Sequence, residues 1–174
     1  SGAAIRHAEA PLRMLVHETG EAAIVVRRVG LSSIGLHHVE TDEPLRVALE
    51  PGAMSPLYAG APGRILLAFA PGEVLDEVLA QDLQRITDST PTEEALRAGL
   101  GSIVMTGVAL SEGELIEGSI AIAAPVFRED GIVGAIGLIG PAFRCDATWR
   151  LRAARLIVEA ARAIDAGLAE DTSL

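Results

Sequence analysis

The sequence lacks several features that would assign it to a class of protein at once. It contains one cysteine, Cys145, so no intrachain disulfide can form and no secreted disulfide framework is indicated. Its apolar runs are all shorter than the roughly 18 residues that a membrane-spanning helix needs. No signal peptide is visible either. We therefore expect a cytoplasmic protein with no membrane partner.

Basic residues and aromatic residues are also scarce. The chain has 14 Lys and Arg against 24 Asp and Glu, a formal net charge of −10. Because phosphate binding needs Lys and Arg, we do not expect this chain to hold nucleic acid by itself. Aromatic residues make up 3% of the 174 residues and hydrophobic residues 49%, which predicts one domain with an aliphatic core.

The pattern of apolar residues and breakers predicts an α+β fold. Neighbouring strands joined by tight turns favour a mostly antiparallel sheet with helices packed on it. The expected helices cover residues 10–19, 56–70, 73–83 and 91–102, with a last helix from 146. The expected strands cover residues 22–30, 31–40, 44–49, 119–127 and 132–139, with an extended segment over 103–111.

Local signals place several of these boundaries. Pro11 suits the first turn of a helix, and Ser55 is expected as the N-cap of another helix with Pro56 at its first position. Residues 90–93 (TPTE) have the spacing of a capping box. The Asp-Gly pair at 130–131 between two apolar runs is typical of a β-hairpin.

The last helix is expected to bury one continuous stripe of its surface. The apolar residues of this stripe recur at helical spacing, which predicts one face turned to the core. They are Trp149, Ala153, Ile157, Ala160, Ile164 and Leu168.

No residue pattern indicates a catalytic, metal or cofactor site. Residues 30–35 (GLSSIG) are one residue too long for a nucleophile elbow and lead into a strand, not a helix. His37 and His38 are adjacent in an expected strand, so their side chains should point to opposite faces. Cys145 has no second thiol near it in sequence, and we interpret it as structural.

Three glutamates, Glu112, Glu114 and Glu117, lie in an expected loop before the hairpin. Paired carboxylates can act as general acid and base, which leaves a small-metabolite enzyme as one alternative. No partner base or metal-ligand pattern accompanies them, and we expect these side chains to be solvated.

The stretch 59–63 (AGAPG) places almost no side chains at the start of a helix. Its spacing does not match a phosphate-binding P-loop. Free N–H groups there would favour an anion, and close packing of helix on sheet would need the same small residues. Along the last strand, Gly137 shares a face with Ala135 and Ile139, which predicts a notch in that face.

Several segments together resemble the IclR family of bacterial transcriptional regulators. Residues 55–68 (SPLYAGAPGRILLA) resemble the family's P-[LM]-[HY]-A-x-x-x-G-[KR]-x-x-L-A segment. Residues 114–118 (ELIEG), 123–127 (AAPVF) and 140–141 (GP) resemble its E-x-x-E-G, A-A-P-V-F and G-P motifs, in the same order. The resemblance covers the chain from about Pro11 to the last helix.

The resemblance implies an effector-binding domain with a GAF-like α+β fold, and not an enzyme. In the family such a domain follows an N-terminal winged helix-turn-helix that binds operator DNA, and nothing in this chain resembles that module. Residues 10–174 would then be the effector-binding domain. Residues 1–9 would be the end of a linker helix or a cloning scar.

The resemblance also implies where an effector would bind. The family's pocket lies between the start of the helix at residues 59–63, called the helix mouth below, and the C-terminal hairpin. The matching positions in this sequence are Val47, Ser55, Gly60, Ala61, Ser111, Ala121, Gly137 and Ile139.

Four of these positions depart from the family members that sense small acids. Those members carry an Asp, a Cys and two Ser where this chain has Ser111, Ala121, Gly137 and Ile139. Three polar anchors are therefore missing, which predicts an apolar or aromatic effector. A carboxylate of such an effector could still bind N–H groups around residues 60–63.

Two readings of the same domain remain open at this point. One is an effector sensor within a homodimer or homotetramer, which needs no cofactor. The other is a constitutive dimerisation module whose pocket is filled or no longer used.

Overall fold

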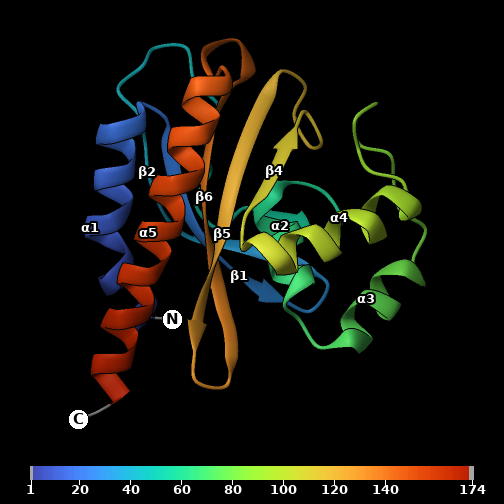
Figure 1. The fold of residues 1–174 in the computed structure, drawn as a ribbon. Helices are drawn as coiled ribbons and strands as arrows, with labels where there is room; N and C mark the ends of the chain where they lie inside the picture. Colours follow the sequence, from blue (N-terminus) through green and yellow to red (C-terminus); the bar gives the residue numbers. More distant parts are fainter. Residues whose placement is uncertain (1, 173–174) are drawn as a thin grey trace.

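The computed structural model describes residues 2–172, which form a six-stranded sheet with helices on both faces (Figure 1). The strand order is β3-β2-β1-β6-β5-β4, and every neighbouring pair is antiparallel. The strands are β1 (Ala22–Val29), β2 (Ser32–Val39), β3 (Met54–Pro56), β4 (Ala109–Glu112), β5 (Ser119–Arg128) and β6 (Gly131–Pro141). The helices are α1 (Gly2–Thr19), α2 (Ala61–Ala68), α3 (Gly72–Leu79), α4 (Glu93–Thr106) and α5 (Ala147–Thr172), with a short 3-10 helix at Ala142–Arg144. The predicted α+β fold is confirmed.

Two hairpins supply four of the strands. The turn between β1 and β2 contains Gly30 at φ 60°, and the turn between β5 and β6 contains Gly131 at φ 128°. Glycine adopts such positive φ angles without the steric cost that a side chain brings. The hairpin predicted from the Asp-Gly pair is therefore confirmed.

Helices α1 and α5 lie side by side on one face of the sheet (Figure 1). Ile122, Ile136 and Leu138 point to this face from alternate strand positions, as the period of a strand requires. The Nε1–H of Trp149 donates a hydrogen bond of 2.8 Å to the Thr19 carbonyl and joins the two helices. The predicted α5 stripe is confirmed, because its five residues after Trp149 are no more than 1% exposed. Within residues 2–172, no helix is both long and apolar enough to cross a membrane.

Helix α2 packs on the opposite face, with α4 against it. Its side chains Ile65 and Leu66 are buried together with Ala121, Ala123 and Ala135 of the sheet. These small residues let the helix approach the strands closely. The mouth of α2 is thereby held over β6 and β1.

The first helix is longer than expected. It begins at Gly2, so Pro11 lies inside the helix and not in its first turn. A proline in a helix interior costs about 3 kcal/mol, because it removes a hydrogen bond and crowds the preceding turn. Ala8, Leu12 and Leu15 are fully buried on either side of it, and burying one leucine alone contributes roughly 1.5–3 kcal/mol. Core burial therefore outweighs the local signal.

The predicted strand at 44–49 is wrong. Those residues form no regular element, and the third strand is β3, which pairs with β2. Leu45 is 64% exposed, so the apolar residues of this segment do not form a buried strand face. Ser55 consequently lies in β3 and is not an N-cap. Helix α2 begins at Ala61, with Gly60 as its N-cap.

The predicted capping box at 90–93 is also wrong in its register. The N-cap of α4 is Thr92, whose hydroxyl accepts the Ala95 N–H at 3.2 Å. The Thr90 hydroxyl instead donates to the Glu114 carbonyl at 2.8 Å. Helix α4 continues to Thr106, so the expected extended segment over 103–111 shrinks to β4.

Candidate functional site

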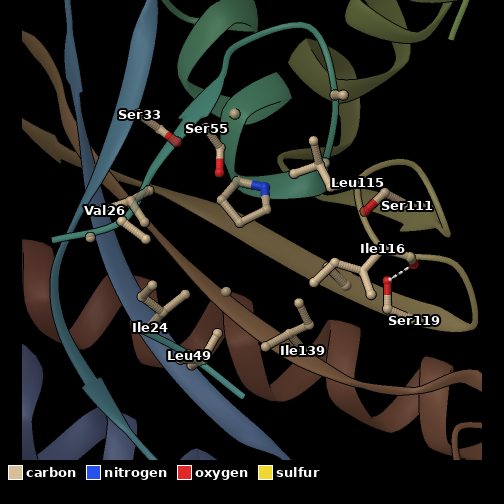
Figure 2. Close-up of a pocket in the computed structure, with 18 of the residues that line it drawn as sticks. Ile24, Val26, Ser33, Leu49, Ser55, Ser111, Leu115, Ile116, Ser119 and Ile139 are labelled. Atoms are coloured by element: carbon tan, nitrogen blue, oxygen red, sulfur yellow. Dashed lines mark hydrogen bonds between the residues drawn. The ribbon is translucent and has the colours of Figure 1, made fainter. Parts of the chain in front are cut away.

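A cavity of about 480 Å³ lies beside the mouth of α2 (Figure 2). Its floor is the sheet, where Ile24 of β1 and Ile139 of β6 face it. One wall is formed by parts of the segment 48–56, which ends in β3, and another by the loop 114–116 between β4 and β5. Cavities of about 300–1,000 Å³ are the size class that binds small organic molecules.

Six of the eight residues expected around an effector line this cavity. They are Ser55, Gly60, Ser111, Ala121, Gly137 and Ile139. Val47 and Ala61 do not line it. Val47 lies in the irregular segment where a strand was expected, and its neighbours Ala48 and Leu49 face the cavity instead. Ala61 is fully buried in the first turn of α2.

Close packing explains the bare backbone at the mouth of α2. Gly60 has φ 85°, and a Cβ on it would lie 2.8 Å from Cδ1 of Leu115. A Cβ on Gly63 would lie 2.9 Å from the carbonyl oxygen of Pro56. Gly63 is thus required by the neighbouring backbone, and Gly60 is favoured by its positive φ as well as by Leu115. The same lack of side chains makes Gly60 and Gly63 part of the cavity wall.

The polar groups at this mouth already have partners within the chain. The Gly60 N–H donates to Oε1 of Glu114 at 2.9 Å, and the Ala61 N–H donates to Oγ of Ser111 at 2.9 Å. Arg64 donates to both carboxylate oxygens of Glu114, at 3.2 and 2.8 Å. The prediction that these two N–H groups would be free for an anion is therefore wrong, because Glu114 and Ser111 occupy them.

Glu114 is also not the solvated side chain that the loop suggested. The side chains of Glu114 and Arg64 are each 11% exposed. Of the other two loop glutamates, Glu112 forms an ion pair with Arg150, and Glu117 is exposed. Glu114 serves as an internal anion at the start of α2, where the helix dipole favours negative charge.

The predicted notch at Gly137 lies directly under the mouth of α2. A Cβ at this position would come within 3.0 Å of Cγ of Pro62 and 3.5 Å of Cγ2 of Ile24. Gly137 pairs with Ala123 of β5, which is also small. Pro62 can pack close to the sheet here because two adjacent strands carry little or no side chain, and Gly137 lines the cavity beside it.

Several residues of the cavity were missed by sequence reasoning. Leu115 and Ile116 reach it from the loop, and Ser33 reaches it from β2. Ile116, Ile86 and Met54 form an apolar rim, being 48%, 44% and 59% exposed. The apolar pair between two glutamates in ELIEG was the available signal for the loop. No signal local in sequence singles out Ser33.

The cysteine and the two adjacent histidines lie outside the cavity and contact other parts of the chain. Cys145 is fully buried, and burial together with the nearby Glu21 carboxylate raises the pKa of its thiol to about 12. The His37 imidazole contacts the Glu9 carboxylate of α1, and Nε2 of His38 lies 3.7 Å from Oε1 of Glu40. Among residues 2–172, no three His, Cys, Asp or Glu side chains are grouped so that they could hold a metal ion.

Comparisons with known proteins identify the family. The family model described as "Bacterial transcriptional regulator IclR C-terminal" matches residues 2–166. The transcriptional regulator BhcR of Paracoccus denitrificans is 34% identical over 168 residues, which cover 95% of this chain and 60% of that protein. A glycerol operon regulatory protein of Streptomyces griseus is 37% identical over 134 residues, or 75% of this chain and 52% of that protein. This chain thus spans just over half the length of these relatives.

Solved structures show the same fold. An IclR homologue of Microbacterium hydrocarbonoxydans, complexed with 4-hydroxybenzoate, superimposes with a TM-score of 0.88. The match covers 97% of this chain and 70% of that one. At 24% identity it shows that the two chains share a fold and says nothing about their ligands. The chain belongs to the IclR family of bacterial transcriptional regulators and corresponds to their C-terminal domain.

Proposed function

We propose that this chain is an effector-binding and oligomerisation domain of an IclR-type regulator, and that an apolar or aromatic effector binds in the cavity beside α2. The observation that carries the proposal is the cavity itself. Its volume of about 480 Å³ suits a ring compound, and its floor is aliphatic side chains and the bare Gly137.

The charges around the cavity support an effector of low polarity. The charged residues that line it are Glu50 and Glu114, and none of its described lining residues is Lys, Arg or His. Glu114 is already paired with Arg64. A small acid would therefore be buried without a cationic partner, which costs free energy. The 4-hydroxybenzoate bound by the Microbacterium homologue supports a ring of this size, but it is an anion at neutral pH and does not support an uncharged ligand.

The rest of the proposed regulator lies outside this domain. We place DNA binding in an N-terminal winged helix-turn-helix that is not part of this chain, in agreement with its net charge of −10. Residues 1–9 would form the end of a linker helix, and residues 10–174 the effector domain of a homodimer or homotetramer. The effector would act by binding the two arrangements of the DNA-binding modules with different affinities.

A thermal-shift screen tests the proposal. One panel holds glyoxylate and pyruvate, and the other holds aromatic acids and phenols. A ligand present at about 100 times its Kd adds roughly 2.7 kcal/mol to the free energy of unfolding. We expect stabilisation by members of the aromatic panel. A response to the small acids alone would contradict the apolar effector, and no response in either panel would favour the constitutive dimerisation module.

A variant that adds a side chain at Gly137 tests whether the effector binds in this cavity. Gly137→Leu should abolish the stabilisation by the bound ring compound, and Gly137→Ala should weaken it, because Pro62 stands 3.0 Å from the added methyl group. Gly101→Leu is the control, since nothing lies within 4 Å of a Cβ at this exposed position of α4. Unchanged ligand affinity in folded Gly137→Leu would place the effector elsewhere.

A further inference from the structure

Two serines face each other across the edge of the sheet at the cavity. Ser33 of β2 and Ser55 of β3 are direct partners in the antiparallel register. Side chains of directly opposite residues lie on the same face, with Cβ atoms roughly 4.5–5.5 Å apart. Both residues line the cavity, and Figure 2 shows their hydroxyls on the side away from Ser111 and Ser119.

Within residues 2–172, neither of these two hydroxyls has a hydrogen-bond partner, whereas the other two cavity serines do. Ser111 accepts the Ala61 N–H, and Ser119 donates to the Ile116 carbonyl at 2.6 Å, the dashed line in Figure 2. Ser33 is 6% exposed and Ser55 is half-buried, and both line the open cavity. Because their hydroxyls have no partner in the described part of the chain, they are free to bond a polar group of a molecule that enters the cavity.

The surroundings of the pair are apolar. Gly35 is two residues further along the same face of β2, and it pairs with Val26 of β1. A Cβ on Gly35 would touch Cδ1 of Ile24 at 3.3 Å, so this strip of sheet is smooth and aliphatic. A flat ring resting on it would carry its polar substituent toward Ser33 and Ser55.

We propose that Ser33 and Ser55 form a subsite that binds the hydroxyl group of an uncharged ring compound. This inference rests on the proposed function and adds the chemistry of the ligand. Each serine hydroxyl has one proton to donate and lone pairs to accept with. A ligand hydroxyl placed between them can donate a hydrogen bond to one serine and accept one from the other. An anion would find no cation there, since the charged lining residues are Glu50 and the paired Glu114.

Matched pairs of neutral ring compounds test this subsite. Each pair differs only by a hydroxyl or a methyl group at the same ring position. Suitable pairs are methyl 4-hydroxybenzoate with methyl 4-methylbenzoate, and 4-hydroxyacetophenone with 4-methylacetophenone. Their Kd values are measured by calorimetry on the wild-type domain, with 4-hydroxybenzoate as the anionic comparison. We expect the hydroxyl members to bind roughly tenfold more tightly than the methyl members.

Variants then assign the preference to the two serines. Ser33→Ala and Ser55→Ala should each remove most of the tenfold preference, while the methyl members keep their wild-type affinity. Ser102→Ala, on the exposed face of α4, should keep the full preference. Retention of the methyl member's affinity also shows that each variant is folded with its cavity intact.

Three outcomes would overturn the inference. Equal affinities within each pair, or a preference that survives in the double variant Ser33→Ala/Ser55→Ala, would show that the serines do not bind the hydroxyl. Binding of 4-hydroxybenzoate but of no neutral compound would overturn the subsite and leave the proposed effector function standing. Binding of no compound, acid or neutral, would overturn both.

Discussion

Glu114 holds the mouth of α2, and its removal should measurably loosen the domain. Its carboxylate accepts hydrogen bonds from the Gly60 N–H and from two nitrogens of Arg64, and the Arg64 guanidinium also donates to the Leu110 carbonyl at 2.6 Å. In Glu114→Ala the Arg64 charge stays nearly buried without its partner. Removing one member of a buried pair costs about 3–5 kcal/mol.

We expect the lower end of that range for Glu114→Ala, about 3 kcal/mol, because both side chains keep 11% of their surface exposed. For a domain of 174 residues this corresponds to a fall in Tm of roughly 6–12 °C. Glu114→Gln keeps one acceptor oxygen and should lose about 1–2 kcal/mol. Urea unfolding followed by circular dichroism gives both free energies.

Glu117→Ala is the matched control, because Glu117 lies in the same loop with an exposed side chain. Its free energy of unfolding should stay within about 0.5 kcal/mol of wild type. If Glu114→Ala were no more destabilised than Glu117→Ala, the internal carboxylate would not be what orders the helix mouth.

Three further results are expected. Glu114→Ala should bind benzoate more tightly than wild type does, because the Gly60 N–H is freed for a ligand carboxylate. Calorimetry measures both affinities, and an unchanged affinity would contradict the prediction. Gly140→Ala should lose about 1–3 kcal/mol of stability, since its Cβ would lie 2.1 Å from Oε2 of Glu21, while Gly101→Ala on exposed α4 should gain about 0.5–1 kcal/mol. Cys145, with a thiol pKa of about 12, should not react with a disulfide reagent at pH 8 until urea unfolds the chain, and rapid reaction of the native domain would show that the thiol is accessible.

The sequence predicted those elements whose signals are local and agree with the core. The Asp-Gly turn between two apolar runs predicted the β5–β6 hairpin, and helical spacing from Trp149 to Leu168 predicted the buried face of α5. Both patterns persist because the same residues satisfy the local geometry and the packing. The fold class followed from the order of these elements.

The failures have a common physical cause. Pro11 and Ser55-Pro56 are good helix-start signals that tertiary contacts override: buried Leu12 and Leu15 extend α1 through the proline, and pairing with β2 draws Ser55 into a strand. Segment 44–49 has the residue types of a strand but no partner strand to pair with. Such contacts join residues far apart in sequence, where propensity carries no information.

The same distinction separates the part of the cavity that could be predicted from the part that could not. Six of the eight residues that the family resemblance suggested line the cavity, and they lie on β3, β4, β5, β6 and at the start of α2; their role in binding an effector stays a prediction. The subsite at Ser33 and Ser55 depends on a strand register between two segments more than twenty residues apart. That register is visible only once β3 is assigned to residues 54–56.

The small residues at 59–63 serve two purposes: they allow close packing, and they form part of the cavity wall. The positive φ of Gly60 and the Pro56 carbonyl next to Gly63 account for these two glycines, so their presence does not by itself indicate a ligand. They also line the cavity, while Pro62 between them packs onto Gly137 at 3.0 Å from a Cβ built there. Any effector must therefore be selected by the groups around the cavity, and within residues 2–172 the cavity serines whose hydroxyls have no partner are Ser33 and Ser55. A change of effector class in a relative with the same helix mouth should accordingly appear at these serines and at Gly137, and not at the two fixed glycines.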